Sequence, residues 1–193
     1  MADWRTLPWR LVWQDGPMAL SRLRRIVVLA THRHARVSIA PDAYLGPRFS
    51  LWIPGAGTLA IGEGVSFRRG FTCEITGEGR VTIGAHTVFT SDALLQCTTS
   101  IDIGRNCVFG QATQIVDGNH RFRDPDLPMT EQGFDFQPVR IGDGVAVMTK
   151  CSIVGATIGD RAFIGANSVV TRDIPAFSLA VGAPAKVVDS FGP

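Results

Sequence analysis

Residues 141–175 read IGDGVAVMTKCSIVGATIGDRAFIGANSVVTRDIP, and this stretch decides the fold. An aliphatic residue recurs about every six positions in it, at Ile141, Val147, Ile153, Ile158, Ile164 and Val170. The Ile-Gly pair that begins the stretch also occurs earlier, at Ile61-Gly62, Ile83-Gly84 and Ile103-Gly104, at separations close to multiples of six. A period this short predicts a β-helix solenoid, in which each hexapeptide forms one side of a coil. Stacked coils then bury the aliphatic residues in one linear core.

The repeat divides the chain into three parts. With 193 residues, the chain is long enough for one domain with a sizeable core. Residues 37–175 are predicted to form about six or seven coils, each of three short parallel strands, stacked at roughly 4.8 Å. Residues 1–36 do not follow the repeat and are predicted to be a cap or arm, and residues 176–193 a short tail packed on the last coil. The predicted fold class is all-β.

The N-terminal segment has two interpretations. It contains Trp4, Arg5, Trp9, Arg10 and Trp13, then a short helix predicted from Met18 to Arg25 and an apolar run to Ala30. Interleaved tryptophan and arginine are typical of an arm that contacts a membrane surface or a lipid-linked substrate. A terminal repeat also needs a cap over the open end of the solenoid. Acidic and glycine residues interrupt any long amphipathic face, which favours the cap.

Composition limits the partners and the compartment. The net charge of +2 and the pI near 8.5 do not indicate a nucleic-acid partner. No apolar run is long enough to span a bilayer, and no signal peptide is recognisable. The four cysteines, Cys73, Cys97, Cys107 and Cys151, show neither a CxxC pair nor a metal-ligand spacing, which predicts buried small residues. We therefore expect a cytoplasmic protein without a bound metal, and if the N-terminal segment is a membrane arm, we expect the protein at the inner face of the membrane.

One long segment interrupts the repeat between His120 and Val139. Residues 121–138 contain three prolines and several charged residues but no hexapeptide. A loop of this length inside a compact fold is usually functional. It is too long and too polar to fit inside a narrow coil, so we expect it to project outward and to carry the chemistry.

The chain resembles the hexapeptide-repeat, left-handed β-helix acyltransferases over about residues 37–190. The resemblance rests on the Ile-Gly repeats, on Asp117-Gly118-Asn119-His120 at the start of the loop, on residues 164–175, and on Gly182-Ala183-Pro184-Ala185-Lys186. The residues around the loop resemble the branch of bacterial polysaccharide and lipopolysaccharide O-acetyltransferases, and they are also close to the maltose and galactoside acetyltransferases. The resemblance implies the left-handed coil.

The same resemblance implies a homotrimer that binds acetyl-CoA between adjacent prisms and transfers the acyl group to a hydroxyl of a sugar or glycoconjugate. His120 stands where the catalytic base of the family stands, and a neutral imidazole suits removal of a hydroxyl proton. Asp92 stands where sugar-acetylating relatives have an acceptor-binding Asn, and Asn119 beside the base is a further candidate for acceptor binding. Asp117 has two open roles: it could orient the imidazole, or it could cap the turn with Gly118.

Late residues match the CoA-binding positions of the family. They are Ala166, Thr171, Arg172 and Lys186, with the two cations suited to phosphates. An alternative for Arg172 is a surface ion pair with Asp173. Two departures concern the pocket wall: Ala146 stands where relatives commonly have Trp, and the spacing from Ile153 to Ile158 is one residue short.

The sequence leaves two other functions open. A γ-type metal enzyme on the same fold needs three histidines on adjacent coils, and no histidine follows His120. A non-catalytic scaffold would fit the missing Trp but not the retained His120, Arg172 and Lys186. His32, His34 and His86 are weaker candidates for any role.

Overall fold

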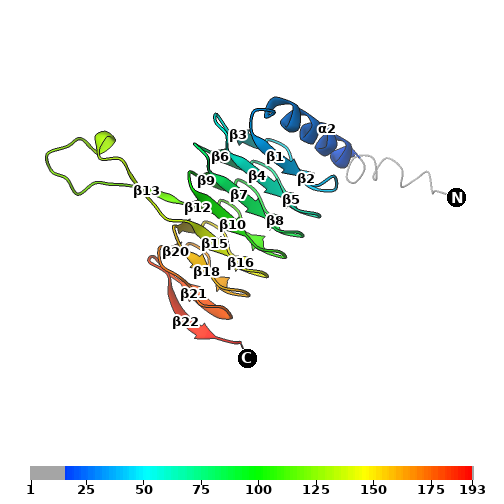
Figure 1. The fold of residues 1–193 in the computed structure, drawn as a ribbon. Helices are drawn as coiled ribbons and strands as arrows, with labels where there is room; N and C mark the ends of the chain where they lie inside the picture. Colours follow the sequence, from blue (N-terminus) through cyan, green and yellow to red (C-terminus); the bar gives the residue numbers. More distant parts are fainter. Residues whose placement is uncertain (1–15, 193) are drawn as a thin grey trace.

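The computed structural model describes residues 16–192, and most of them form one prism of stacked coils (Figure 1). Three parallel sheets make the sides of the prism. The first sheet contains β1 (Arg36–Ile39), β4 (Thr58–Ile61), β7 (Arg80–Ile83), β10 (Ser100–Ile103), β15 (Val139–Ile141) and β18 (Thr157–Ile158). The predicted β-helix is confirmed, because strands three apart along the chain pair in parallel, as β1 pairs with β4.

The second and third sheets follow the same order, except that the strands on either side of the loop are five apart, β19 pairs with β21, and β22 pairs antiparallel at the end of the second sheet. The second contains β2 (Tyr44–Leu45), β5 (Ser66–Phe67), β8 (Val88–Phe89), β11 (Val108–Phe109), β16 (Ala146–Val147), β19 (Phe163–Ile164), β21 (Ser178–Val181) and β22 (Lys186–Ser190). The third contains β3 (Ser50–Trp52), β6 (Thr72–Ile75), β9 (Leu94–Cys97), β12 (Gln114–Val116), β17 (Ser152–Val154) and β20 (Val169–Val170). Each coil therefore has three corners, which we call the first–second, second–third and third–first corners after the sheets they join.

The repeat positions form the core. The isoleucines of the Ile-Gly pairs are all buried. Inside the second sheet, the rings of Phe67, Phe89 and Phe109 stack with centroid separations of 5.3 Å and 4.5 Å. All four cysteines are free and buried, as predicted. Burial raises the pKa of the Cys97 thiol to about 12, so this thiol stays protonated at neutral pH.

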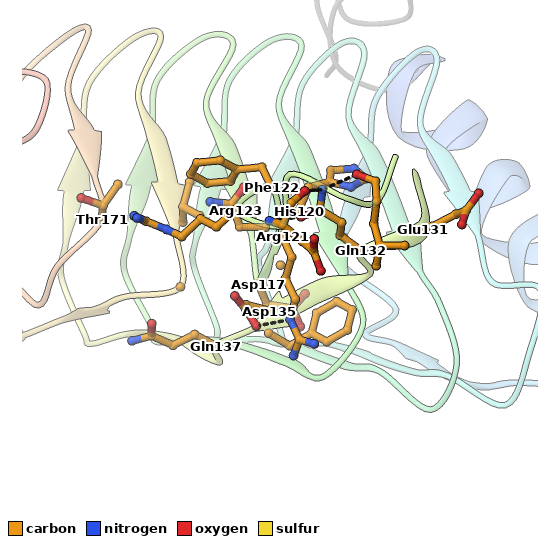
Figure 2. A pocket seen from close by; sticks show the side chains of 17 residues that line it. Asp117, His120, Arg121, Phe122, Arg123, Glu131, Gln132, Asp135, Gln137 and Thr171 are labelled. Carbon is orange, nitrogen blue, oxygen red and sulfur yellow. Dashed lines mark hydrogen bonds and ion pairs between the residues drawn. The ribbon is translucent and has the colours of Figure 1, made fainter. Parts of the chain in front are cut away.

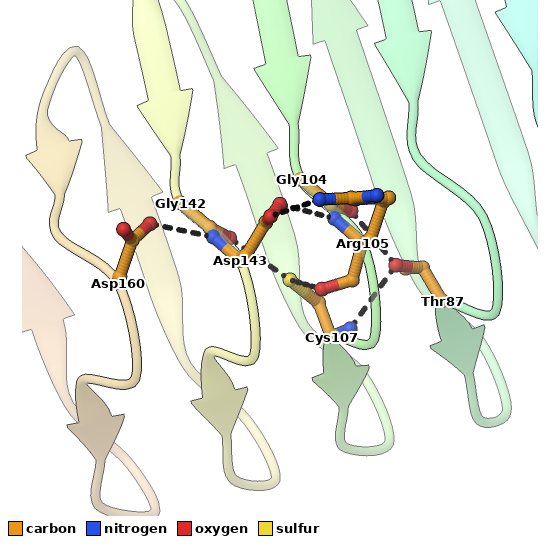
Figure 3. Close-up of polar contacts among 7 residues, drawn as sticks. All are labelled: Thr87, Gly104, Arg105, Cys107, Gly142, Asp143 and Asp160. Carbon is orange, nitrogen blue, oxygen red and sulfur yellow. Dashed lines mark hydrogen bonds and ion pairs between the residues drawn. The ribbon is translucent and has the colours of Figure 1, made fainter.

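The corners between the first and second sheets are tied together along the prism (Figure 3). The Asp143 carboxylate accepts the Arg105 backbone N–H at 2.8 Å and pairs with its guanidinium at 3.2 Å. The Asp160 carboxylate accepts the Asp143 N–H in the same way, at 2.8 Å. Sterics explain why glycine follows isoleucine at this corner, since a Cβ on Gly104 would lie 2.5 Å from the Gly142 carbonyl oxygen. These ties continue the stack from the coil before the loop to the coils after it.

Helix α2 (Gly16–Thr31) lies across the N-terminal end of the prism and packs on β1 and β2 (Figure 1). The Ser21 hydroxyl, which is buried, accepts the Leu45 N–H at 2.8 Å, and the Arg24 guanidinium donates to the Leu45 carbonyl at 3.0 Å. The helix is longer than the predicted Met18–Arg25, because the apolar run to Ala30 continues it. Trp4, Trp9 and Trp13 lie outside the described residues.

The C-terminal segment does more than pack on the last coil. Ile174 bridges to Ile158, and β21 adds a further parallel strand to the second sheet, so the coil continues beyond Pro175. The chain then reverses, and β22 pairs antiparallel with β21. This reversal ends the parallel stack at the end of the prism opposite α2 (Figure 1). Within residues 16–192 no helix has the length and apolarity needed to cross a bilayer.

Candidate active site

The protruding loop leaves the prism at a third–first corner, between β12 and β15 (Figure 1). Its two ends form a short antiparallel ribbon of β13 (Gly118–His120) and β14 (Phe134–Phe136). The Gln137 N–H donates to the Asp117 carbonyl at 2.8 Å and closes the base of the ribbon. The loop thus starts to separate from the coil at Asp117, slightly earlier than the repeat predicts, and it projects outward as predicted.

The far part of the loop is held by its own hydrogen bonds. The Gln132 amide donates to the carbonyls of Asp124 and Leu127 at 2.9 and 2.8 Å and accepts the Asp124 N–H at 3.0 Å. A single 3-10 turn, η2 (Met129–Glu131), precedes Gln132. Arg121 pairs with Asp135 across the ribbon at 2.7 Å. The loop is therefore an ordered structural unit, although every residue from 119 to 131 is exposed.

A groove of about 790 Å³ lies between this loop and the following coils (Figure 2). Asn119 and His120 line it from β13, Val154 and Gly155 from the next coil, and Thr171 from the coil after that. His120 is exposed, and its ring lies 4.2 Å from the Phe134 ring between centroids. Within residues 16–192, no hydrogen bond restrains the imidazole nitrogens, so they are open to a bound molecule.

The short spacing between Ile153 and Ile158 falls beside this groove. The corner between β17 and β18 contains only Gly155 and Ala156. Gly155 has φ +51°, and a Cβ there would lie 2.8 Å from the Gln137 Cβ. The short corner therefore makes room for the returning strand of the loop.

Asp117 has neither of the two predicted roles, which were to orient the His120 imidazole or to cap the turn with Gly118. Its buried carboxylate accepts the Thr98 N–H at 2.9 Å, the Thr99 N–H at 2.6 Å and the Thr99 hydroxyl at 2.8 Å. It also accepts a bond from the Cys97 thiol at 3.5 Å. These donors belong to the preceding coil, and the structure shows no hydrogen bond from this carboxylate to His120. Asp117 anchors the start of the loop. The sequence does not predict this role, because it does not show which residues of neighbouring coils lie side by side.

The other candidate residues divide between two corners. Thr171 and Arg172 follow β20 at the third–first corner, as His120 does. Asp92 and Ala166 lie at second–third corners, and Lys186 begins β22 beside Val181, at the same side of the last coil. Asp92 has φ 61° and pairs with Arg48, two coils earlier, at 2.9 Å. One chain therefore does not bring all the predicted site residues together.

The cationic candidates are free within the described part of the chain. Arg172 and Lys186 are exposed and make no ion pair among residues 16–192. Asp173, the alternative partner for Arg172, accepts the Thr157 N–H at 2.8 Å instead. Asn119 is exposed on β13, opposite Asp135.

Ala146 faces outward on the second sheet, away from the corner that carries His120. It lies between Val108 and Phe163 on the neighbouring strands. Phe163 is 37 % exposed and is the first large aromatic residue on this face after Ala146.

The weaker candidates lie elsewhere: the His32 and His34 rings contact the carbonyls of Leu51 and Ile53 at the N-terminal end. Among residues 16–192, no three His, Cys, Asp or Glu side chains converge.

Comparison with known proteins supports the resemblance. A probable acetyltransferase of Mycobacterium tuberculosis is 38 % identical over 112 residues, which are 58 % of this chain and 37 % of that protein. A putative lipopolysaccharide biosynthesis O-acetyl transferase of Escherichia coli is 25 % identical over 152 residues, or 75 % of this chain and 78 % of that protein. This chain thus spans little more than a third of the first relative. No protein-family model matches the chain.

Solved structures agree. A hexapeptide-repeat acetyltransferase of Vibrio cholerae matches with a TM-score of 0.56 at 27 % identity, covering 77 % of this chain and 74 % of that one. The resemblance to hexapeptide-repeat acyltransferases is confirmed. The same Vibrio protein, solved in complex with acetyl-CoA, matches 100 % of this chain and 92 % of that one, with a TM-score of 0.58 at 21 % identity.

Proposed function

We propose that this protein is a CoA-dependent O-acyltransferase that moves an acyl group, most simply acetyl, to a hydroxyl of a sugar or glycoconjugate. The observation that carries the proposal is the exposed His120 imidazole at the base of an ordered loop, facing a groove that Thr171 lines from two coils away. The names of the relatives support the reaction class.

His120 supplies the base that the reaction needs. Its neutral imidazole takes the proton of the acceptor hydroxyl while the oxygen attacks the thioester carbonyl. The tetrahedral intermediate collapses, the C–S bond breaks, and the imidazolium returns its proton to the thiolate of CoA. The products are an ester and free CoA, so no covalent enzyme intermediate and no metal are required. A base of this kind contributes about 10²–10⁴-fold to the rate.

The donor would be held by residues from both corners. Arg172 and Lys186 are exposed and unpaired within residues 16–192, so their cations are available to the phosphates of CoA. Thr171 and Ala166 are also exposed, at the third–first and second–third corners respectively. In a single prism these corners are separated by one side of the coil, whereas two adjacent prisms can place them face to face. This division supports a homotrimer, a closed assembly in which each site is shared by two protomers.

A sugar acceptor is supported by the Escherichia coli relative, whose name refers to lipopolysaccharide biosynthesis. Asn119 offers an exposed amide beside His120, and Asp92 offers a carboxylate at the other corner. The Asp92 carboxylate would have to bind the acceptor while it also pairs with Arg48. The free thiols fit a reducing, cytoplasmic location.

The test combines binding and turnover. The wild-type protein is titrated with acetyl-CoA by calorimetry, and CoA release is measured with a panel of mono- and disaccharides. We expect His120→Ala to keep acetyl-CoA binding and to lose about 10²–10⁴-fold in transfer rate. His86→Asn is the matched control, because His86 is exposed at a first–second corner and Asn tolerates its φ of 59°. Unchanged transfer in His120→Ala would remove this residue as the base, and absence of acetyl-CoA binding would favour a non-catalytic scaffold.

A further inference from the structure

Helix α2 presents an apolar face to solvent although its other face already caps the prism. The capping side carries Ser21 and Arg24, which bond to the first coil. The opposite side carries four large exposed side chains, Leu20, Leu23, Ile26 and Val27, which are 52–58 % exposed, together with Ala19 and Ala30. At 100° per residue these six positions share one side of the helix, and no charged residue lies among them. Capping therefore does not explain this face.

The charge around this face has one sign. Between residues 16 and 41 the chain carries five arginines, Arg22, Arg24, Arg25, Arg33 and Arg36, and no acidic residue. The whole chain has a net charge of only +2, so the rest of the molecule is net negative. Arg22, beside the apolar face, and Arg33, just beyond the helix, are both exposed. A basic helix end with an apolar outer face is complementary to an anionic lipid surface, because the acyl chains accept apolar side chains and the headgroups carry negative charge.

We propose that the outer face of α2 docks the molecule on an anionic membrane surface, with the helix lying in the plane of the interface. Leu20, Leu23, Ile26 and Val27 enter the boundary between headgroups and acyl chains, and Arg22 and Arg33 contact the headgroups. The helix lies across the end of the prism, so docking stands the prism on the membrane and leaves the protruding loop free at its side (Figure 1). This geometry would suit an acceptor attached to lipid, a point that rests on the proposed function, whereas docking itself does not.

A second copy of the chain is the competing occupant. Two α2 helices could cover each other's apolar faces, but this pairing would bring the arginines of both copies close together without an acidic partner on either helix. Like charges brought together in this way oppose association. The membrane is favoured because it supplies the missing negative charge.

Vesicle co-sedimentation tests the proposal on the full chain. The vesicles contain either phosphatidylcholine alone or equal parts of phosphatidylcholine and phosphatidylglycerol. The wild-type protein is expected to bind the mixed vesicles at least ten-fold more strongly, with binding that weakens as salt rises. The double variant Leu23→Gln with Ile26→Gln is expected to lose roughly ten-fold or more in partition coefficient, because it removes half of the large apolar side chains of the face. Both positions are exposed, so its melting temperature should stay close to that of the wild type.

The matched control is Val188→Gln with Phe191→Gln, two exposed apolar residues at the opposite end of the prism. This variant should bind vesicles like the wild type. Two results would overturn the proposal. One is equal vesicle binding by the two double variants. The other is no binding of the wild-type protein to the mixed vesicles, whatever oligomeric mass light scattering gives for the Leu23/Ile26 variant. Acetyl-CoA binding, measured in parallel without vesicles, should be unchanged in both variants. Loss of vesicle binding is thereby separated from failure of the proposed acyl transfer.

Discussion

Asp117 shows how one side chain can connect the prism to its protruding loop. Its carboxylate is buried and receives two backbone N–H bonds from Thr98 and Thr99, and its own carbonyl closes the base of the ribbon through Gln137. A carboxylate engaged in this way has little capacity left for a substrate. Asp117 therefore acts as a structural anchor for the strand that carries His120.

Replacement of Asp117 by Ala should destabilise the protein. The N–H groups of Thr98 and Thr99 would lose their partner in a partly buried turn, at a cost of about 1–3 kcal/mol. Urea unfolding measures this loss, and His120→Ala, which removes an exposed ring, serves as the control with little change expected. A role in acceptor binding would give the opposite pattern, with unchanged stability and a raised KM for the acceptor.

At the scale of the element, the phenylalanine stack inside the second sheet is the most specific packing feature. Phe89 is fully buried between Phe67 and Phe109. Its truncation removes aromatic contacts from both neighbouring coils at once, and stacked coils cannot close the cavity without losing their strand register.

We expect Phe89→Ala to lower the free energy of unfolding by about 3–5 kcal/mol. Val88→Ala is the control on the same strand, since Val88 faces outward and its loss should cost less than about 1 kcal/mol. Chemical denaturation of the two variants gives the comparison. Similar losses for both would mean that the stack does not dominate the packing of this sheet.

The elements also show what sequence could and could not predict. The Ile-Gly pairs predict the coils because, with a period of six residues, stacked three-sided coils are the arrangement that buries every isoleucine. The sequence predicts too short a helix α2, because the apolar residues after Arg25 fit a helix and a strand equally well. The sequence does not predict β21 and β22, because Pro175 and Pro184 indicate that strand pairing ends. Pro175 lies at a corner of the last coil, and Pro184 lies in the turn between the two strands. The anchoring bonds of Asp117 depend on contacts between coils, which no local pattern reveals.

At the scale of the whole molecule, the distribution of candidate residues is the main result. His120, Thr171 and Arg172 lie at third–first corners, whereas Ala166 and Lys186 lie toward the second–third side. Because strand pairing is continuous along all three sides of the prism, no hinge brings these corners together in one chain. Assembly of several chains is the simplest way to complete a site, and each site would then need two protomers.

Mixing of inactive subunits tests this claim most directly. His120→Ala and Lys186→Ala proteins are each prepared, combined in equal amounts, dissociated and reassembled, and CoA release is measured at an acetyl-CoA concentration at which neither parent protein shows turnover. If each site takes His120 from one protomer and Lys186 from its neighbour, random trimers regain about a quarter of the wild-type rate, because one interface in four combines two intact contributions. A mixture that stays as inactive as its two parents, or a wild-type protein that is fully active as a monomer, would contradict the shared site.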